Sequence, residues 1–317
     1  MRDISGKTTS LRTAKVLAVV SCSQETLERI QADNLPKGNL LDVARSAGLL
    51  ASKQTHNLIP HSHSISIDAL DISYSYIENG ECSEDVGTVS AEYGIAIIVQ
   101  GKSISRTGIE TVLLTAASIS ALTIYDLLEP LDCGVEIMST RLLEKDPEKN
   151  KLQKVTGQQN KVAVLICSDS VAAGRKKDRT GPIIGRLLEE HNADVIDYKI
   201  MPDRPEAIQA QLNEWSSMNI PFVFTVGGTG IGPKDRVVDA VKAVIERETP
   251  GIVEAMELHG LQRTPLAMMS RLTAGVLKGT LIVTLPGSSD GLRQSLEGLL
   301  PGVFYAKKML RTATMNS

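Results

Sequence analysis

The chain has 317 residues, the length of about two domains of ordinary size. Hydrophobic residues make up 42% of it and charged residues 22%, which excludes a largely disordered or collagen-like chain. The net charge of −3 argues against a broad basic face for nucleic acid. Aromatic residues, at 3%, argue against base stacking as a main function.

The four cysteines are scattered without Cys-x-x-Cys spacing, so neither a disulfide framework nor a Cys-rich zinc site is predicted. No apolar signal core follows Met1. The most apolar run covers residues 109–128, but Glu110, Asp126 and several Ser and Thr residues interrupt it. We interpret this run as a buried helix and not as a membrane span. We expect a cytoplasmic protein that binds neither nucleic acid nor membranes.

A polar segment divides the chain into halves of nearly equal length. Residues 144–161 are rich in charged and amide side chains and almost free of apolar ones, which predicts a linker. We therefore expect one domain over residues 1–148, a linker over 149–160 and a second domain over 161–317. The two halves have different patterns, and no internal repeat is present.

The first half predicts an α+β domain. A helix is expected near residues 39–53, followed by alternating, half-buried strands over 64–77 and 92–99. A long helix is expected over 108–128. This order predicts an antiparallel sheet with helices on one face. The long helix is apolar nearly all round, which places it between layers or at a subunit interface.

The second half alternates between buried strands and helices. Strands are expected over 161–168, 195–200, 221–226 and 280–285, with helices over 181–191 and 204–216 between them. Such alternation predicts a three-layer α/β domain with a mostly parallel sheet. Ligands of these sheets bind beyond the carboxyl ends of the strands.

A glycine-rich segment lies at one of these strand ends. Gly227-Gly228-Thr229-Gly230 follows a buried strand and precedes a helix that starts near Asp235. Glycines there let backbone N–H groups approach a phosphate. The segment lacks the lysine of a Walker loop and the later glycine of a dinucleotide fingerprint, so a plain turn is an open alternative.

Three other strand ends carry polar residues: Ser168-Asp169-Ser170, Asp203 and Pro286-Gly287-Ser288. In a parallel sheet these loops converge with the glycine segment at one edge. Asp203 and Asp235, with Asp169 as a third candidate, would then supply oxygen ligands suited to Mg²⁺. Mg²⁺ beside nucleotide phosphates indicates phosphoryl or nucleotidyl transfer. Each aspartate taken alone could equally cap a helix or a turn.

These residues belong to an ordered series of motifs, which is Ser168-Asp169-Ser170, Asp178-Arg179-Thr180-Gly181-Pro182, Met201-Pro202-Asp203, Gly227-Gly-Thr-Gly-x-x-Pro-x-Asp235, Glu246-Arg-Glu-x-Pro-Gly251, Met269-Ser270-Arg271 and Leu285-Pro-Gly-Ser288. The series resembles the molybdopterin-binding family of MogA and MoaB type, which includes molybdopterin adenylyltransferase. The resemblance implies transfer of AMP from ATP, with Mg²⁺, to the molybdopterin phosphate. It implies Asp203 and Asp235 as catalytic and metal-binding residues.

The same resemblance implies a set of residues that contact the bound cofactor or nucleotide: Ser168, Asp169, Gly227, Gly228, Thr229, Gly230, Ser270, Pro286, Gly287 and Ser288. One departure stands out. The family's Asp-Val-Thr-Pro-Glu-Ala is here Asp235-Arg-Val-Val-Asp239-Ala, which alters the start of the helix that faces the cofactor.

The first half contains three histidines within eight residues, His56, His61 and His63. A His-x-His pair could bind a metal or could simply be exposed or hydrogen-bonded. An acid–base role needs partners from elsewhere, and the candidates are Lys37, Lys53, Glu110, Asp126 and Lys145.

The first half also resembles a known family. Asp3-Ile-Ser, Leu11-Arg12, Lys37-Gly38-Asn39, Ala47-Gly48, Lys53, Leu58-Ile-Pro60, Ser62-His63, Thr107-Gly-Ile-Glu110 and Tyr125-Asp126 occur in order. They are similar to cyclic pyranopterin monophosphate synthase of MoaC type, which converts 3′,8-cyclo-dihydro-GTP and releases pyrophosphate. The resemblance implies Lys37, Lys53, His63, Glu110, Asp126 and Lys145 as site residues, with Arg12 as a phosphate contact.

This half departs from its family at several positions. Asn39 replaces an aspartate, Val112 replaces a second acid, and the family's Leu-Cys-His-Pro is His61-Ser-His-Ser64. Glu129 stands where the family has a catalytic lysine. A glutamate that faces a triphosphate would repel it, by about 1–4 kcal/mol at 4 Å.

Three interpretations follow. Both halves are active, or an active adenylyltransferase is joined to a degenerate half that serves oligomerisation, or the protein is a non-catalytic molybdopterin carrier. The substrates expected are molybdopterin, ATP and, for an active first half, 3′,8-cyclo-dihydro-GTP. The apolar helix over 108–128 and both resemblances predict a homotrimer or homohexamer.

Overall fold

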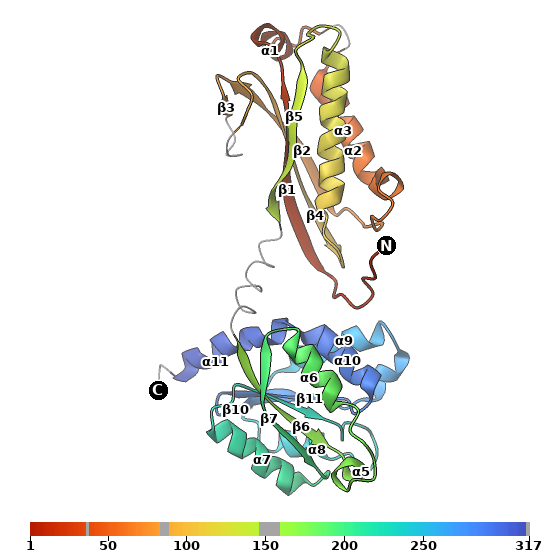
Figure 1. Cartoon of the computed structure of the whole chain (residues 1–317), viewed down its shortest axis with the longest axis vertical. Coiled ribbons are helices and arrows are strands. Elements are labelled where there is room, and N and C mark those ends of the chain that lie inside the picture. The colour runs from red at the N-terminus through yellow and green to blue at the C-terminus, as the bar shows by residue number, and fades with distance from the viewer. Residues whose placement is uncertain (36–37, 83–88, 146–158, 315–317) are drawn as a thin grey trace. The chain divides into compact units, whose positions relative to one another are not determined.

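The computed structural model describes residues 1–35, 38–82, 89–145 and 159–314. The chain divides into two compact units, Met1–Glu148 and Lys149–Ser317, which we describe separately (Figure 1). The linker predicted over 149–160 lies almost entirely outside the described residues, so its character stays a prediction.

The first unit contains a five-stranded antiparallel sheet with strand order β3-β2-β4-β1-β5. Its strands are β1 (Ser10–Ser21), β2 (Ala69–Glu78), β3 (Glu81–Cys82), β4 (Gly94–Ser105) and β5 (Glu136–Lys145). β1 pairs with β4 along its whole length and with β5 on its other side. It is a central strand that the sequence patterns did not predict.

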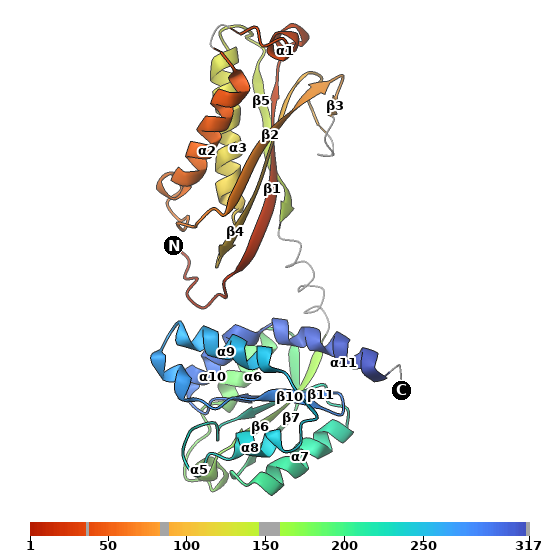
Figure 2. The same cartoon turned by 180° about the vertical axis from the view of Figure 1, so that it is seen from behind.

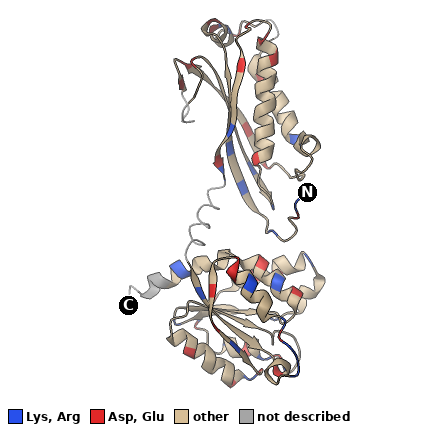
Figure 3. Ribbon diagram, viewed as in Figure 1, with Lys and Arg blue, Asp and Glu red and all other residues tan. Residues whose placement is uncertain are grey.

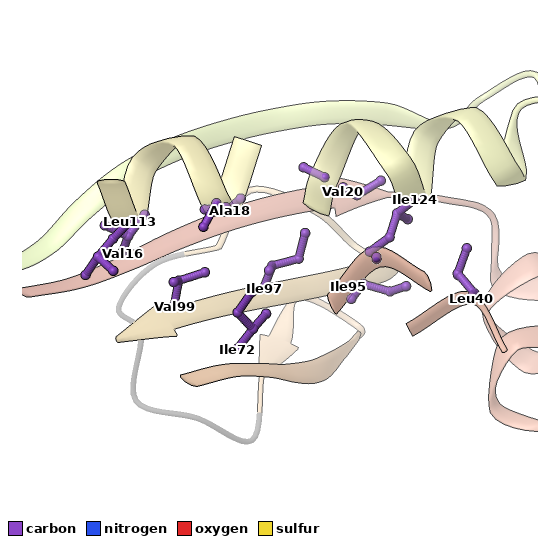
Figure 4. Close-up of a cluster of buried hydrophobic side chains, with 14 of the residues drawn as sticks. Val16, Ala18, Val20, Leu40, Ile72, Ile95, Ile97, Val99, Leu113 and Ile124 are labelled. Atoms are coloured by element: carbon purple, nitrogen blue, oxygen red, sulfur yellow. The ribbon is translucent and has the colours of Figure 1, made fainter. Parts of the chain in front are cut away.

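Three helices complete this unit: α1 (Gln24–Gln31), α2 (Leu40–Leu58) and α3 (Glu110–Leu128). The Asn39 side chain accepts a hydrogen bond from the backbone of Asp42 and so begins α2. The helices bury their apolar sides on one face of the sheet, against Val16, Ala18, Val20 and their neighbours (Figure 4). Helices on one face of an antiparallel sheet is the predicted arrangement.

Helices α2 and α3 pack closely along their lengths. Ser120 Oγ donates to the carbonyl of Ala44 at 3.0 Å. A Cβ at Gly48 would overlap the Ser120 hydroxyl and lie 3.0 Å from the carbonyl of Ala116. Since Ala44 meets Ser120 and Gly48 also meets Ala116, the two helices run in opposite directions, and the end of α2 lies towards the start of α3.

Among the helices that the structure describes, α3 alone is long and apolar enough to cross a membrane. One such helix is weak evidence for a span, because core helices pass the same test. Leu113, Ala117 and Ile124 on α3 are fully buried in the core of the first unit. We therefore interpret α3 as the core helix of a globular domain.

The second unit contains a six-stranded sheet with strand order β7-β6-β8-β11-β10-β9. Its strands are β6 (Asn160–Cys167), β7 (Ala193–Met201), β8 (Phe222–Val226), β9 (Arg247–Glu248), β10 (Ala274–Leu277) and β11 (Thr280–Leu285). The first four in this order are parallel, and β10 and β9 form an antiparallel edge. The four strands expected from the sequence are these four parallel strands, and the sequence patterns did not predict β9 and β10. The edge depends on a two-residue turn at Lys278-Gly279, where both residues have positive φ.

Helices cover both faces of this sheet (Figures 1 and 2). One face packs against α6 (Gly181–Glu189), α9 (Pro250–Leu261) and α10 (Ser289–Leu299), and the other against α7 (Pro205–Ser217) and α8 (Val237–Lys242). The remaining elements are α5 (Asp169–Ala172), α11 (Ala306–Thr314) and the 3₁₀ helices η1 (Pro265–Met269) and η2 (Gly302–Tyr305). The carboxyl ends of β6, β8 and β11 lie at one edge of the sheet, as the parallel pairing requires.

Candidate functional sites

A pocket of about 960 Å³ lies beyond the carboxyl ends of the parallel strands in the second unit. The predicted residues that line it are Ser168, Asp169, Asp203, Gly227, Gly228, Asp235, Gly287 and Ser288. Five separate segments of the chain thus converge on one cavity, in the place where parallel sheets bind their ligands.

The first two residues of the glycine segment have a backbone that favours glycine. Gly227 and Gly228 have φ values of 99° and 60°, in the left-handed region that favours glycine. A Cβ at Gly227 would overlap the carbonyl of Cys167, and one at Gly228 would overlap Val237 and the carboxylate of Asp203. The Gly227 N–H donates to the carbonyl of Leu285 at 3.0 Å. That N–H joins β8 to β11, so it cannot bind a phosphate as the sequence pattern predicted.

Three carboxylates lie near one another at the pocket. The backbone N–H of Asp203 donates to Asp169 Oδ1 at 3.1 Å, and that of Arg236 donates to Asp203 Oδ2 at 3.4 Å. Asp203 Oδ1 is buried and has no hydrogen-bond partner. Burial, together with the charges of Asp169 and Asp235, raises the pKa of Asp203 above its usual value. A buried carboxylate oxygen in this condition would be stabilised by a cation.

The residues present fit Mg²⁺ that arrives with a nucleotide better than a resident metal. Across the described ranges, no group of three or more His, Cys, Asp or Glu residues is placed to hold a metal ion. Mg²⁺ in nucleotide sites uses one or two carboxylates and takes its other ligands from phosphates and water. Asp203 and Asp235 would supply those carboxylates.

Five basic residues line the same pocket: Arg175, Lys176, Lys177, Arg179 and Lys234. Asp178 lies within this basic segment but is engaged locally, because its carboxylate accepts from the backbone of Thr180 and Gly181 and from the Tyr198 hydroxyl. Burial alone would raise the pKa of Asp178, but these hydrogen bonds outweigh it and lower the pKa. Asp178 is thus engaged by other groups, and the positive charge of the basic residues can attract an anionic ligand, although Arg175 also donates to the carbonyl of Asp169 at 3.5 Å.

The sequence motifs did not point to this basic segment. The signal was present, since Arg175-Lys176-Lys177 and Arg179 fall between a strand end and a helix start. The net charge of −3 sums over the whole chain and does not show a local cluster of basic residues.

Some residues of the predicted set lie away from the main pocket. Ser270 and Pro286 line a neighbouring pocket of about 290 Å³, which shares Ser288 with the main one. Thr229 is buried, and neither it nor Gly230 lines the main pocket. A Cβ at Gly230 would lie 2.7 Å from the Asp235 carboxylate, so this glycine allows Asp235 to approach the loop.

In the first unit, part of the predicted site is assembled where α3 begins. Lys145 Nζ lies 3.0 Å from Glu110 Oε1. Arg12 Nε donates to the carbonyl of Ser105, which ends β4 shortly before α3. Lys53 is exposed in the last part of α2, which lies towards this same end of α3. His63 Nε2 is 2.9 Å from the carbonyl oxygen of Arg2.

Asp126 is separated from that group by the length of α3. At about 1.5 Å per residue it lies about 24 Å along the helix axis from Glu110. Figure 3 shows α3 nearly free of charge between acidic residues at its two ends. Lys37, a further predicted site residue, lies outside the described residues.

Two of the positions that depart from the family pattern have different environments. Glu129 is exposed at the C-terminal cap of α3, and its backbone N–H donates to Tyr125. Val112 is 4% exposed and packs in the hydrophobic core.

The fold and the two sites define a protein that combines an antiparallel α+β domain with an α/β domain whose pocket suits a phosphorylated small molecule. Residues 1–147 match the MoaC family, and residues 163–304 match the probable molybdopterin binding domain. These matches confirm both resemblances that the motifs indicated.

Relatives with both domains cover nearly the whole chain. The molybdenum cofactor biosynthesis bifunctional protein of Chlorobaculum tepidum is 35% identical over 311 residues, 98% of this chain and 94% of that protein. The protein of the same name from Synechococcus elongatus is 28% identical and covers 99% of this chain and 98% of its own length. Cyclic pyranopterin monophosphate synthase of Bacillus subtilis is 41% identical over 150 residues, 47% of this chain and 82% of that enzyme. The chain belongs to the family of bifunctional molybdenum cofactor biosynthesis proteins.

Proposed function

We propose that the second unit transfers AMP from ATP to the phosphate of molybdopterin. The observation that carries this proposal is the division of charge in the main pocket, with Asp169, Asp203 and Asp235 near the glycine segment and five basic residues around them. Polyphosphates need cationic partners, and a metal–phosphate complex needs carboxylates. This pocket offers both at one edge of the sheet.

In this reaction a phosphate oxygen of molybdopterin attacks the α-phosphorus of ATP. A P–O–P bond to AMP forms, the bond between the α- and β-phosphates breaks, and pyrophosphate leaves with its electron pair. Bound Mg²⁺ supplies neutralisation of charge on the phosphates. Arg175, Lys176 and Lys177 attract and hold the polyphosphate, while Asp203 and Asp235 would hold the Mg²⁺ that binds to it.

The test uses the full chain with ATP labelled at the α-phosphate. We expect label on the pterin and release of pyrophosphate only when molybdopterin and Mg²⁺ are both present. Asp235→Asn should abolish transfer, and Asp194→Asn, an exposed change on β7, should not alter it. Binding of molybdopterin without any ATP turnover would refute adenylyl transfer and support the carrier interpretation.

We further propose that the first unit converts 3′,8-cyclo-dihydro-GTP to cyclic pyranopterin monophosphate with release of pyrophosphate. Support comes from the 41% identity to a cyclic pyranopterin monophosphate synthase and from the group of Arg12, Glu110 and Lys145 at the start of α3. In this group Lys145 and Arg12 provide positive charge for phosphates, and Glu110 is placed to orient Lys145.

The separation of Asp126 from Glu110 bears on assembly. One copy of the chain cannot bring these two side chains to one substrate, because about 24 Å of α3 lies between them. We propose that a second copy supplies Asp126, within a homotrimer or homohexamer. Light scattering on the full chain should report such an assembly, and a monomer that still produces the pterin would refute it.

The measurement for the first unit is an assay of the full chain with the cyclic dihydro-GTP substrate, read as the fluorescent pterin oxidation product. Glu110→Gln should remove product formation, and Glu136→Gln, an exposed change at the start of β5, should keep it. No product from the unaltered chain, with adenylyl transfer intact, would favour the interpretation of a degenerate, oligomerising first half.

A further inference from the structure

Arg271 joins two segments of the second unit that are far apart in sequence. Its backbone N–H donates to the carbonyl of Thr229 at 2.7 Å. Its guanidinium donates to the backbone carbonyl of Asp235 at 3.1 Å. Both acceptors belong to the loop that carries the glycine segment and ends at Asp235.

The guanidinium is itself held by Asp239 on α8. Two nitrogens of Arg271 donate to the two carboxylate oxygens of Asp239, at 2.8 and 3.4 Å. Two parallel bonds fix the plane of an arginine side chain as well as its position. Asp239 stands in the family motif at the position of the glutamate in Asp-Val-Thr-Pro-Glu-Ala, so this departure keeps an acid at the position.

Arg271 lines neither the main pocket nor the neighbouring one. The Arg271–Asp239 pair is also too exposed, at 42% and 59%, to contribute much to stability. Its geometric effect falls on Asp235, whose carboxylate is held from the other side by the Gly232 N–H at 2.9 Å. Asp235 is thus restrained at its carboxylate by the loop and at its carbonyl by Arg271.

We infer that Arg271, held by Asp239, is a positioning residue that fixes the Asp235 carboxylate for catalysis in the main pocket. The preceding residue, Ser270, lines the neighbouring pocket. The bonds that Arg271 forms with the loop therefore also fix the position of that pocket relative to the main one. The kinetic part of this inference rests on the proposed adenylyl transfer, while the restraint on the loop does not.

The experiment compares Arg271→Met, Arg271→Lys and Asp239→Asn in the full chain. Methionine keeps the unbranched stem of the side chain and the backbone bond to Thr229 but removes every side-chain donor. We expect the kcat of Arg271→Met for adenylyl transfer to fall about tenfold or more, with KM for ATP and molybdopterin within twofold. The Mg²⁺ concentration for half-maximal rate should rise several-fold. Lysine should restore most of kcat, and Asp239→Asn should lie between the two.

A second readout needs neither substrate nor metal. Hydrogen exchange of the Gly232 and Asp235 amides should become at least tenfold faster in Arg271→Met. Arg186→Met is the matched control, since Arg186 on α6 forms an exposed ion pair with Glu190 at the end of that helix, and no hydrogen bond or ion pair joins it to the described residues of this loop. It should change neither kcat nor exchange in the loop.

The outcomes separate the two proposals. An unaltered chain without adenylyl transfer refutes the proposed function, and the exchange measurement then decides the inference by itself. Unchanged exchange in Arg271→Met overturns the inference in either case. A fall in kcat that lysine does not relieve, accompanied by an equal loss of thermal stability, would also overturn it, because that pattern indicates a structural role.

Discussion

Asp203→Asn should make the second unit more stable and inactive at once. The substitution keeps the size of the side chain and removes a charge that burial and the neighbouring Asp169 and Asp235 disfavour. The amide oxygen of the variant can accept from the Arg236 N–H as Oδ2 does, and the amide nitrogen then takes the buried position of the unpaired Oδ1. The change in stability therefore reports the electrostatic effect.

The magnitude is limited by solvent. Two unit charges 4 Å apart repel by about 1 kcal/mol in water and about 4 kcal/mol at an effective dielectric constant of 20. Asp203 is only partly buried, so screening places the gain at about 0.5–1 kcal/mol. A gain of 1 kcal/mol raises Tm by about 2–4 °C in a domain of 150–250 residues, so we expect about 1–4 °C.

The effect has a defined pH dependence. The pKa of Asp203 is raised in the folded protein from its usual 3.8, so the folded state binds a proton more readily than the unfolded state. The destabilisation is therefore absent below about pH 3.8 and complete once the pH exceeds the folded pKa. The advantage of the Asn variant should be full at pH 7.5 and should shrink as the pH falls towards 4.

Trp215 provides the assay, because it is the single tryptophan of the chain and is fully buried on α7. Its fluorescence follows unfolding of the second unit alone. Mg²⁺ with a non-hydrolysable ATP analogue should raise the Tm of the unaltered chain and have little effect on Asp203→Asn. Asp194→Asn, which is exposed, should behave like the unaltered chain. An Asn variant that is less stable at pH 7.5 without Mg²⁺, or is stabilised equally by it, would refute this account of Asp203.

Two further changes test the glycine loop and the first unit. Gly228→Ala should lower the free energy of unfolding by about 2 kcal/mol or more, because φ is 60° and the new Cβ overlaps Val237 and Asp203. Gly185→Ala on α6, with nothing within 4 Å of its Cβ, should instead stabilise by about 0.5–1 kcal/mol; urea titration of Trp215 fluorescence compares the two, and equal effects would contradict the steric argument. Glu129→Lys should raise the rate of pterin formation by the first unit and stabilise α3 by about 0.3–1 kcal/mol, since a cation suits a helix C-terminus. A rate that does not change in a folded variant would show that Glu129 does not limit this reaction.

Most helices and strands with a regular pattern of apolar residues could be predicted from the sequence. The strand over 280–285 was found because a buried run is bounded by turn residues, and the helix over 108–128 because of its length. β1 was missed because both of its faces are covered, with Val16, Ala18 and Val20 towards the helices and Leu17 and Val19 towards a second cluster. Its residues therefore do not alternate. β5 was missed for the opposite reason, since most of its side chains are exposed.

The residues of the candidate sites could be predicted only where they belong to a sequence motif. Ser168, Asp203 and Gly228 follow strands at fixed places in the second half, and parallel pairing brings such places together. The partner of Lys145 was not predictable, because the 3.0 Å contact with Glu110 joins β5 to α3. The Arg271–Asp239 pair was likewise not predictable, because it joins the segment that follows η1 to α8.

In the first unit, Val112 stands where the family has an acid and Glu129 where it has a lysine, and these two positions differ in burial. Glu129 is exposed, so a lysine there meets no steric or desolvation barrier. Val112 is 4% exposed within the core cluster, so Val112→Glu removes apolar contacts and places a carboxyl group against them. We expect this variant to lose at least about 2 kcal/mol at pH 7.5.

Protonation should reduce that loss at low pH, because burial raises the pKa of a carboxyl group. Urea unfolding at pH 7.5 and at pH 5, followed by the circular dichroism of the full chain, compares Val112→Glu with Val112→Gln, which has the same size and shape but no charge. If Val112→Glu is as stable as the unaltered chain, a neighbouring cation must hold the new carboxylate, and the core around Val112 is a site after all. If instead it is unstable while Glu129→Lys raises the rate of product formation, the second acid is dispensable, and the charge at the end of α3 limits the reaction of the first unit.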